Sequence, residues 1–562
     1  MNRKELSQEF RESPQLREVA ADIHNYHPRA HDGGSAVYLP NKNTIVSLGA
    51  ERVDRIKYSP DSIAAYNYLR SRLGRQGYVF GGTKDKFEPV YIPDQDIHHH
   101  LAHAASAFYP SGFDNAGVLV VDDRGYYKDG YNSTTIWSGN NTDLRPLEMN
   151  TEIGFPTQSI GHFYSGITDY LGFGFLEAGK TMGLAAYGRK SEVMDWLGSF
   201  VQINSDGTYR IDPTFCQAMR YLYSDIEHGR VANPEKPVMD TMNAIASFLG
   251  HRREKTDPIT QGHMDTAWAV QETLEQLMLG LAKRTKNLSG SSKLCLAGGV
   301  ALNSVANGKI INTELFDEVF IQPAAGDDGQ ALGKLLYRLH TEYGIKRMPS
   351  MNTAYLGPEY SEEEVSAVLD KYRGELRFEK KDTCELLQLT AQALSKQHIV
   401  GWYQGGSEIG PRALGHRSIL ADPRSDWMRD HINFKVKNRE WFRPFAPSVL
   451  LEKANEYFDI KAPSPFMLVV SDVKPDKRTV IPAVMHVDGT ARVQTVTQTE
   501  NGIYYELIKE FGRQTGVPVL LNTSFNVAGE PIIETPEDAI RSFLGTKLDL
   551  LVMHNYFIEK KK

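Results

Sequence analysis

Gly117-Val118-Leu119-Val120-Val121 is an apolar, β-branched run that indicates a buried strand, and Asp122 follows it directly. A second run of this kind covers residues 319–321. Between the two, residues 264–284 repeat apolar side chains at the helical period. This mixture of strand and helix patterns predicts an α/β architecture rather than an all-α or all-β one.

The length and charge of the chain narrow the class of protein. A chain of 562 residues is too long for one hydrophobic core, so we expect at least two domains. Glycine and proline collect in residues 343–358 between two helical patterns, which indicates a linker. We therefore predict domains at residues 1–350 and 351–562. The formal net charge of −7 disfavours a protein that mainly binds nucleic acid.

Cysteine usage and hydropathy indicate the compartment. The three cysteines, Cys216, Cys295 and Cys384, lie far apart and form neither a disulfide framework nor a cysteine-based zinc site. No apolar run approaches the ~18 residues of a membrane span, and the N-terminus lacks the apolar core of a signal peptide. We expect a cytoplasmic protein with no membrane partner.

A histidine-rich helix is the first candidate for a site. An alanine-rich run predicts a helix with Asp96 as its N-cap and Pro110 as its stop. His99 and His103 then share one face and could bind one metal ion, whereas His100 points about a quarter-turn away. Helical zinc proteases use this spacing, but they need Glu where this chain has His100. The alternative is a polar helix with several histidines near the surface.

Carboxylates placed after the two strand runs could complete a metal site. Asp122 follows the first run, and Asp327 and Asp328 follow the run at 319–321. Two histidines with one or two carboxylates suit a divalent transition metal with positions left open for a ligand. Each aspartate could instead cap a turn, which is a common role of this residue. The choice between Asp327 and Asp328 stays open from the sequence.

Two glycine-rich segments are candidate phosphate-binding turns. Gly298-Gly299 follows an expected strand at 293–297 and leads into an expected helix at 300–311. The other segment covers residues 177–184. Glycine lets the backbone approach a phosphate closely, and a following helix offers its N–H groups. Neither segment has the P-loop spacing, and either could be only a turn.

Basic residues in the second half lie among glycine, proline and aromatic residues. Arg412, Lys437 and Arg443 are the members with this context. Arginine binds phosphate and carboxylate oxygens in pairs, so the pattern predicts an anion or nucleotide site. A solvated basic face is the alternative. Further candidates are Arg492, Asn522 and Ser524.

His31 stands near the start, in His31-Asp32-Gly33-Gly34-Ser35. A histidine beside small residues at a turn could act as a general base. Taken alone, it could equally be structural or solvated.

Together these motifs resemble the O-carbamoyltransferase family of the nodulation protein U and antibiotic-tailoring type. The residues that carry the resemblance run in order along nearly the whole chain: His31-Asp32, 51–57, 99–109, 179–188, 296–303, 326–329, 410–418, 437–447, 488–493 and 521–526. Three departures stand near the start. The usual opening strand is not evident around residues 23–28. A polar extension precedes the usual beginning, and Ala50-Glu51-Arg52 replaces the usual Glu-Glu-Arg.

The resemblance implies a first domain with an actin-like (ASKHA, Kae1-like) fold and a second with a YrdC-like twisted α/β fold. It implies that the second domain converts carbamoyl phosphate and ATP, with Mg²⁺, to carbamoyl adenylate. The first domain would then pass the carbamoyl group to a hydroxyl of a small molecule, such as a natural product or a sugar-containing metabolite. Fe(II) or another divalent transition metal would lie near the acyl phosphate. The resemblance admits a homodimer and implies no nucleic-acid partner.

The resemblance also assigns roles to residues. The implied metal ligands are His99, His103, Asp122 and Asp327, and His31 resembles the base for the acceptor hydroxyl. The implied ATP and carbamoyl phosphate site comprises Arg412, Lys437, Arg443, Arg492, Asn522 and Ser524, of which Arg412, Lys437 and Arg443 would act in catalysis. The implied nucleotide-holding turns of the first domain contain Glu177, Lys180, Gly298, Gly299 and Asn303.

Two other functions stay open from the sequence. A tRNA-modifying transferase would share distant relatives of both domains, although the negative net charge disfavours it. A non-haem iron oxygenase would use two histidines and a carboxylate as its metal ligands. An oxygenase function would give no role to the arginine-rich second half of the chain.

Overall fold

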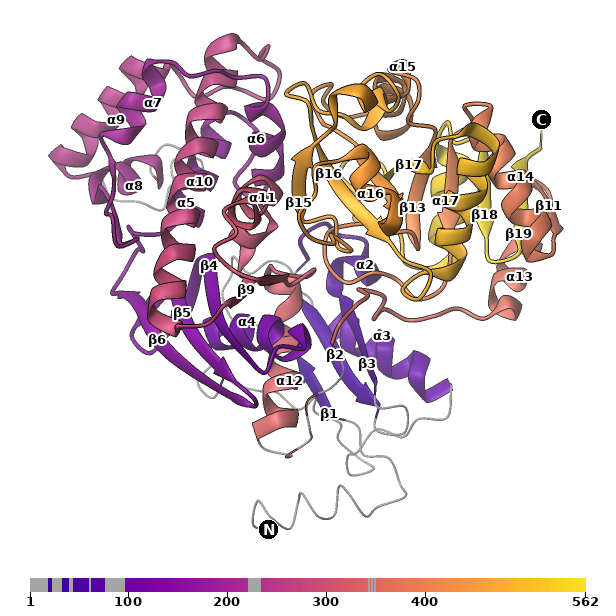
Figure 1. Ribbon diagram of the computed structural model, residues 1–562, viewed down its shortest axis with the longest axis horizontal. Helices are drawn as coiled ribbons and strands as arrows, with labels where there is room; N and C mark the ends of the chain where they lie inside the picture. Colours follow the sequence, from indigo (N-terminus) through magenta and orange to yellow (C-terminus); the bar gives the residue numbers. More distant parts are fainter. Residues whose placement is uncertain are drawn as a thin grey trace. The chain divides into compact units, whose positions relative to one another are not determined.

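The structure is a computed structural model, and it describes residues 19–22, 33–39, 44–59, 62–75, 97–220, 234–341, 344, 347 and 350–561. Contacts divide the chain into two compact units. The central unit is Asp94–Gly326, and the split unit joins Met1–Pro93 to Asp327–Lys562. Both units contain sheets and helices, which confirms the predicted mixed α/β class (Figure 1). The predicted boundary near residue 350 lies within the split unit and stays a prediction.

A five-stranded sheet forms the base of the central unit, in the order β10-β9-β4-β5-β6. Its strands are β4 (Asn115–Tyr127), β5 (Gly130–Asn140), β6 (Asp143–Glu152), β9 (Lys293–Ala297) and β10 (Glu318–Ile321). The hairpin strands β4, β5 and β6 are antiparallel, whereas β9 and β10 run parallel to β4. A separate two-stranded sheet pairs β7 (Val201–Ile203) with β8 (Tyr209–Ile211).

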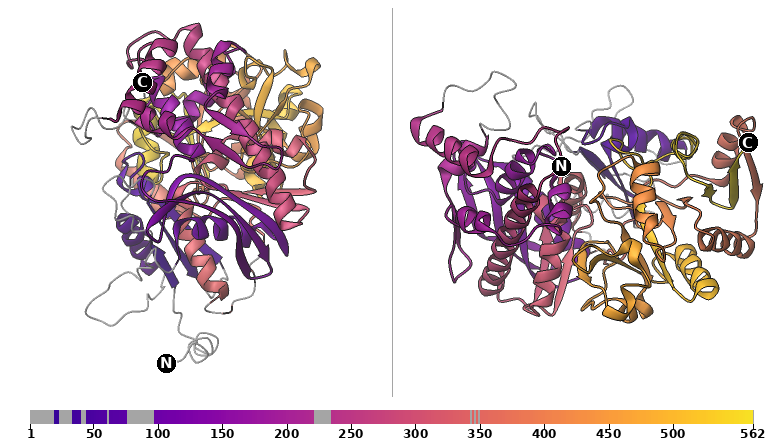
Figure 2. Two further views of the ribbon diagram at one scale, coloured as in Figure 1. Left: turned by 90° about the vertical axis from the view of Figure 1, so that its left-hand side faces the viewer. Right: turned by 90° about the horizontal axis from the view of Figure 1, so that it is seen from above.

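Helices cover both faces of this sheet (Figure 2). A Cβ added to Gly139, which pairs with Ala116, would meet Phe108 of the first helix, α4. A Cβ on the next residue, Gly117, would meet Thr285 of α10. Because successive side chains of a strand point to opposite faces, α4 and α10 lie on opposite sides of the sheet. The helices of the unit are α4 (His99–Phe108), α5 (Ile160–Tyr170), α6 (Ala178–Ala185), α7 (Glu192–Gly198), α8 (Pro213–Arg220), α9 (Lys236–Leu249), α10 (Gln261–Ser289) and α11 (Ser304–Asn312), with short 3₁₀ turns η1 (Tyr109–Ser111) and η3 (Gly299–Leu302).

The structure confirms the long helix as α10 and the predicted strand at 293–297 as β9, and it corrects two other expectations. Asp122 does not end its strand, because β4 continues to Tyr127. The β4–β5 register shifts between Val121 and Gly125, so Asp122 lies at an irregularity of the pairing. Residues 178–185, expected as a glycine-rich turn, form the helix α6. Glycine costs a helix only about 1 kcal/mol, and packing of α6 against α10 outweighs this local preference.

The described residues of the split unit form two sheets. The smaller is antiparallel, in the order β1 (Val19–Asp22), β2 (Gly34–Leu39), β3 (Thr44–Gly49), and it packs with α3 (Ser62–Arg75) and α12 (Gln330–Thr341). The short helix α2 (Ala50–Asp54) continues directly from β3, and the turn η4 (Asp327–Gly329) precedes α12.

The larger sheet has nine strands in the order β11-β19-β18-β12-β13-β17-β14-β16-β15. They are β11 (Leu376–Lys380), β12 (Val400–Tyr403), β13 (Arg417–Ala421), β14 (Ala446–Leu450), β15 (Val469–Asp472), β16 (Thr490–Val496), β17 (Val519–Ser524), β18 (Leu550–Met553) and β19 (Tyr556–Lys560). The accompanying helices are α13 (Glu362–Lys371), α14 (Thr383–Ser395), α15 (Trp427–His431), α16 (Leu451–Tyr457), α17 (Gly502–Thr515) and α18 (Pro536–Gly545), with the turns η5 (Ile432–Lys437), η6 (Pro475–Lys477) and η7 (Pro482–Val484).

Alternating side chains build a separate core on each face of this large sheet. Trp402 and Leu420 pack in one core with residues of α14 and α17. Their neighbours Tyr403 and Ile419 pack in the other core, with residues of α13, α16 and α18. Among the described residues, no helix combines the length and the apolar character that crossing a membrane requires.

Candidate functional site

Helix α4 presents its histidines in different directions. Its N-cap is His98, whose Nδ1 accepts a hydrogen bond from the Leu101 N–H at 3.4 Å. The predicted cap, Asp96, lies outside the described residues and is not the residue that precedes the helix. The rings of His99 and His103 lie edge to face with centroids 4.7 Å apart, because four residues complete about one turn. His100 turns away, as its quarter-turn offset predicts.

A hydrogen bond to β5 fixes the direction of His100. Its Nδ1 lies 2.9 Å from the Oγ1 of Thr135. Burial, and then the neighbouring His99, lowers the pKa of His100 well below its usual value. His100 is therefore a neutral side chain that packs α4 against the sheet.

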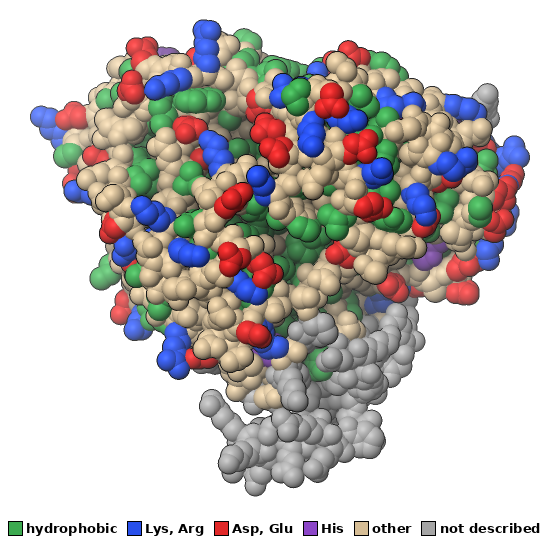
Figure 3. Space-filling view, viewed as in Figure 1, with side chains coloured by type: hydrophobic (Ala, Val, Ile, Leu, Met, Phe, Trp, Pro, Cys, Tyr) green, Lys and Arg blue, Asp and Glu red, His purple; other side chains and the backbone are tan. Residues whose placement is uncertain are grey.

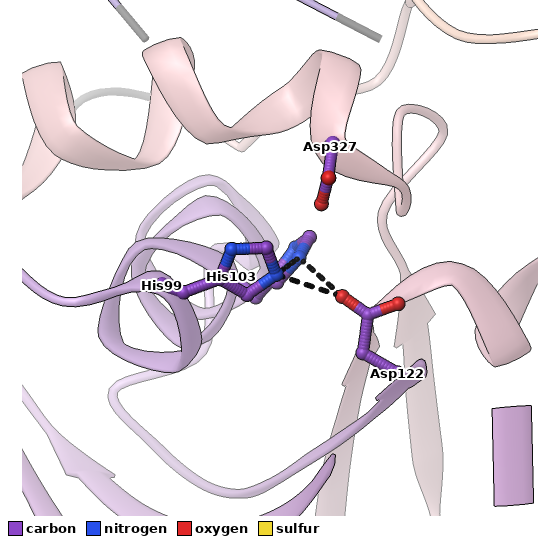
Figure 4. Close-up of side chains that lie close together, drawn as sticks. All are labelled: His99, His103, Asp122 and Asp327. Atoms are coloured by element: carbon purple, nitrogen blue, oxygen red, sulfur yellow. Dashed lines mark hydrogen bonds and ion pairs between the residues drawn. The ribbon is translucent and has the colours of Figure 1, made fainter. Parts of the chain in front are cut away.

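Asp122 meets the two aligned histidines (Figure 4). Its Oδ2 lies 2.9 Å from His99 Nε2 and 3.1 Å from His103 Nε2, and these two nitrogens are 3.2 Å apart. The other oxygen, Oδ1, accepts a hydrogen bond from the Gly299 N–H at 3.1 Å. Asp122 is thus oriented by the Gly298-Gly299 turn, with one oxygen left to face the histidines.

Asp327 is the fourth member of the cluster. It directly follows Gly326, the last residue of the central unit. One ligand atom from each of His99, His103, Asp122 and Asp327 lies within 4.8 Å of the others. Asp327 belongs to this group, whereas Asp328 does not. We refer to these four residues as the His/Asp cluster.

The His/Asp cluster fits a divalent transition metal. Ligand atoms at right angles around an ion lie about 3 Å apart when the bonds are about 2.1 Å long, and the three shortest separations here are close to that. Imidazole and carboxylate donors suit iron, manganese or zinc. Burial raises the pKa of Asp122, but hydrogen bonds from His103 and His99 outweigh burial and hold that pKa well below its usual value. The carboxylate is therefore ionised, as a metal ligand must be.

The Gly298-Gly299 turn has a clear structural reason. Gly298 has a φ of +87°, and a Cβ there would lie 2.2 Å from the Val121 carbonyl oxygen. Only glycine fits this close approach of backbone to β4. The turn leads to Asn303, whose Oδ1 caps α11 by accepting from the Ala306 N–H at 3.1 Å.

The other predicted residues of the central unit occupy helix starts. The amides of Asn303 and Gln271 of α10 exchange two hydrogen bonds of 3.0 Å. Glu177 precedes α6 and forms an ion pair with Lys180 at 3.6 Å. Both α6 and α11 pack against α10. Nucleotide binding by these residues stays a prediction.

The predicted anion site of the split unit is assembled around Lys437, at the end of η5. Its Nζ donates to Oδ1 and O of Asn526, at 2.6 and 3.0 Å, and to both oxygens of Ser524, the last residue of β17. Burial, and then Arg439 and Arg443, lower the pKa of Lys437 well below its usual value. A buried ammonium among other cations favours an anion as its partner.

The side-chain amide of Asn522, on β17, donates hydrogen bonds to three other segments of the split unit. Its Nδ2 donates to the Ala413 carbonyl at 3.1 Å, to Ser448 Oγ at 3.1 Å and to Gln494 Oε1 at 2.9 Å. Ala413 follows Arg412, so β17 is joined to the segment that carries this arginine.

The basic side chains of this region lower one another's pKa by charge repulsion. Burial and Arg443 lower the pKa of Arg412 to about 10. Burial and then Arg412, Arg439 and Arg443 lower the pKa of Arg492 well below its usual value. We call Arg412, Lys437, Arg439, Arg443 and Arg492 the cation cluster.

Arg439 is not among the residues predicted from the sequence. Its Nε donates to Asn433 Oδ1 at 2.8 Å, and its guanidinium lies 4.6 Å from the centroid of the Phe445 ring. Burial and then Arg443 lower its pKa well below the usual value. The available signal was its position two residues after Lys437, within the same basic segment. His31, the predicted base, lies outside the described residues.

The sequence matches two family models. The model described as Carbamoyltransferase N-terminus matches residues 81–336, and the one described as Carbamoyltransferase C-terminus matches residues 391–560. The chain belongs to the carbamoyltransferase family and is a carbamoyltransferase.

Relatives support this assignment along most of the chain. Uncharacterized protein sll1178 of Synechocystis sp. is 39% identical over 88% of this chain and 80% of its own. Nodulation protein NolNO of Sinorhizobium fredii is 38% identical over 83% of this chain and 64% of its own. Nodulation protein NolO of Bradyrhizobium diazoefficiens is 36% identical over 83% of this chain and 79% of its own. A crystal structure of full-length HypF, in the phosphate- and nucleotide-bound form, aligns at 12% identity over 59% of this chain and 56% of that chain, with a TM-score of 0.31 that is too low to indicate a shared fold.

Proposed function

We propose that this carbamoyltransferase is ATP-dependent and acts on a hydroxyl of a small molecule. The observation that carries the proposal is the cation cluster, which collects five basic side chains at one place in the split unit. Such a cluster suits the phosphates of ATP and carbamoyl phosphate, since arginine binds phosphate oxygens in pairs and each bound anion relieves repulsion among the cations.

In the proposed first half-reaction, carbamoyl phosphate, ATP and water give carbamoyl adenylate, pyrophosphate and phosphate. Nitrogen donates electrons into the carbamoyl carbonyl and makes it a poor electrophile, so attachment of AMP supplies the leaving group. Arg412, Lys437 and Arg443 would stabilise negative charge on the departing phosphates. Asn522 and Ser524 would hold the segments that carry them. Mg²⁺ would enter with ATP.

In the proposed second half-reaction, the acceptor oxygen attacks the carbamoyl carbon and AMP leaves. A base takes the hydroxyl proton, and His31 is the candidate from its sequence context. The His/Asp cluster would hold Fe(II) or another divalent transition metal, which supplies Lewis-acid polarisation next to the acyl phosphate when bound. The predicted nucleotide-holding residues Glu177, Lys180, Gly298, Gly299 and Asn303 would position AMP for departure.

Two features support a small acceptor over nucleic acid. The net charge is −7, and acidic and basic side chains are interspersed on the face drawn in Figure 3. Sequence-independent grip on a nucleic acid needs a basic surface that neutralises several phosphates. The His/Asp cluster alone would also suit an iron oxygenase, but that function gives the cation cluster no role.

Use of ATP and carbamoyl phosphate, together with the low cysteine content, supports a cytoplasmic location.

The two larger sheets support a fold assignment for each domain. The central sheet places three antiparallel strands beside two parallel ones, which supports an actin-like arrangement. The mixed nine-stranded sheet with the cation cluster supports a YrdC-like domain. We propose that the two half-reactions belong to these two parts, and that the chain can work as a homodimer.

Mass spectrometry tests the proposed function directly. The protein, loaded with Fe(II), is incubated with ATP, Mg²⁺, carbamoyl phosphate and a panel of hydroxylated metabolites. We expect a mass gain of one carbamoyl group on an acceptor and equal formation of AMP. Carbamoyl transfer that needs no ATP, or transfer to tRNA alone, would contradict the proposal.

A further inference from the structure

A buried carboxylate organises the loop that carries Arg412. This Arg412 loop, residues 404–416, connects β12 to β13. Glu408 is 2% exposed, and its Oε1 accepts hydrogen bonds from the N–H groups of Leu414, His416 and Arg417 at 2.7, 2.9 and 3.2 Å. One oxygen therefore holds the backbone on the far side of Arg412. Charge-assisted hydrogen bonds of this kind are stronger than neutral ones.

The end of the loop also holds its beginning. Arg417 is fully buried, and its Nη1 donates to the carbonyl oxygens of Gln404 at 2.6 Å and Gly405 at 3.1 Å. Its guanidinium lies 3.8 Å from the centroid of the Tyr403 ring. The loop is thus closed on itself by its own charged residues.

A third charged residue reaches the loop from a distant part of the sequence. Arg52 of α2 is 4% exposed, and its Nη2 donates to the carbonyl oxygens of Glu408 at 3.2 Å and Gly410 at 3.3 Å. Its Nη1 donates to the Ile533 carbonyl oxygen at 3.3 Å. The planar guanidinium can serve several acceptors at once, which a lysine ammonium cannot do with the same geometry.

The residues that follow Arg412 are held from the other side. The Ala413 carbonyl oxygen accepts from Asn522, and the Leu414 carbonyl oxygen accepts from Gln494 Nε2 and Tyr355 Oη, both at 2.8 Å. The backbone is therefore fixed before Arg412 by Arg52 and after it by the large sheet. A side chain on such a loop can be held in one position without making many contacts of its own.

Electrostatics bind Arg52 and Glu408 to each other. Burial raises the pKa of the Glu408 carboxyl. The nearby His416 and Arg52 lower it by more than burial raises it, so the pKa of Glu408 lies below the usual value. Glu408 is therefore charged and, together with Glu534, opposes the lowering of the Arg52 pKa by burial. Removal of the Glu408 charge would leave the buried Arg52 less well compensated.

We propose that Arg52 is a positioning residue for the adenylate-forming half-reaction, because it fixes, through Glu408 and Gly410, the loop that presents Arg412. The proposal rests on the proposed function of the cation cluster. Arg52 contacts none of the reacting groups in this account. It links the small sheet of the split unit, from which α2 extends, to the anion site.

The test compares two lysine substitutions on the same short segment. Arg52→Lys keeps the charge but loses the geometry that reaches three carbonyls. Arg55→Lys is the matched control, because Arg55 donates to the carbonyls of Ile532 and Pro531, at 2.6 and 3.1 Å, and to none in the Arg412 loop that the structure records. Hydrogen exchange of the amides of residues 414–417 measures the loop without any substrate. Exchange of labelled pyrophosphate into ATP, dependent on carbamoyl phosphate, measures the half-reaction.

We expect Arg52→Lys to raise the exchange rate of the Leu414, His416 and Arg417 amides by about tenfold or more, the factor for one net hydrogen bond to a charged group. The KM for carbamoyl phosphate should rise by a similar factor, with a smaller change in kcat. Arg55→Lys should change neither quantity, even where both variants lower the melting temperature equally. Equal loop exchange and equal KM in the two variants would overturn the proposal.

Two additions keep the outcome clear. Glu408→Gln preserves volume and removes the charge, so it should speed loop exchange in the same way if Arg52→Lys does not fold. Absence of pyrophosphate exchange in the unsubstituted protein would contradict the proposed function instead. In that case the amide exchange rates, with and without inorganic phosphate, still decide whether Arg52 holds the loop.

Discussion

The His/Asp cluster and the cation cluster differ in the sign of the charge that each one lacks. In the first, Asp122 faces two imidazoles, and hydrogen bonds from both keep its carboxyl ionised despite burial. In the second, burial and mutual repulsion lower the pKa of Lys437 and Arg492. The first arrangement is ready for a cation, whereas the second is incomplete without an anion. The two clusters thus have the opposite charge properties that the two proposed half-reactions require.

The largest effect should come from the cation cluster. Lys437→Met removes a buried ammonium that would stabilise charge on departing phosphate. Loss of one such stabiliser costs about 2.7–4 kcal/mol of barrier, or about 10²–10³-fold in rate. We expect this loss in carbamoyl-phosphate-dependent pyrophosphate exchange. Lys435→Met, at an exposed position two residues earlier, is the control and should exchange normally. An equal loss in both variants would mean that the segment, and not the ammonium, matters.

The His/Asp cluster should respond through metal content. His103→Ala removes one of four proposed ligands, and we expect metal affinity to fall by at least the 10–100-fold that loss of an outer partner costs. Metal analysis after dialysis measures this. His100→Asn is the control, because His100 faces Thr135 and not the cluster. Full metal occupancy in His103→Ala would show that the four residues do not form the site.

The two clusters should also differ in their effect on stability. Arg492 is held with its pKa well below the usual value, so its charge destabilises the folded protein without an anion. Arg492→Met should raise the melting temperature by roughly 2–4 °C, the shift for about 1 kcal/mol in a domain of 150–250 residues. It should also reduce the stabilisation by inorganic phosphate. Arg513→Met, at a side chain 67% exposed, should leave both quantities unchanged. A lower melting temperature for Arg492→Met would contradict the electrostatic account.

Local sequence patterns predicted those elements whose secondary structure depends mainly on their own residues. The strand at 293–297 and the helix around 264–284 follow from period and composition, as does the shared face of His99 and His103. The helix α6 was missed because its glycines indicate a turn, whereas its packing on α10 decides the outcome.

Long-range contacts account for the rest. Asp327 and Asp328 are equivalent in sequence, and only the folded chain selects Asp327. The contact of Arg52 with Glu408 joins residues 356 positions apart, so no local pattern could indicate it. The sequence indicated residue types that suit each proposed site. It could not show how their backbones are held.

The last of these effects concerns pH and the Arg412 loop. Burial lowers the pKa of His416 to about 4, while its ring stacks on Tyr355 with centroids 3.6 Å apart. Between that pKa and the usual value of about 6.5, the unfolded chain binds the additional proton, so stability is present above pH 6.5 and falls as the pH drops toward 4. One such group contributes a slope of at most about 1.4 kcal/mol per pH unit.

Replacement of the histidine should flatten this slope. His416→Asn retains a donor for the Gly406 carbonyl oxygen, which accepts from His416 Nδ1 at 2.6 Å. Urea unfolding at several pH values between 4 and 6.5 measures how many protons the chain takes up when it unfolds. This number should be smaller by up to one in His416→Asn than in the unsubstituted protein. Above pH 7 the slopes of the two proteins should agree. An unchanged slope in the acid range would show that His416 is not a source of the pH dependence.

The separation of the two half-reactions is the central claim, and one paired measurement tests it most directly. His103→Ala and Lys437→Met are assayed side by side for carbamoyl-phosphate-dependent pyrophosphate exchange into ATP and for carbamoyl transfer to an acceptor. We expect His103→Ala to exchange pyrophosphate at the rate of the unsubstituted protein but to transfer no carbamoyl group, whereas Lys437→Met should lose both. Equal loss of pyrophosphate exchange in the two variants would contradict the assignment of the two clusters to separate steps.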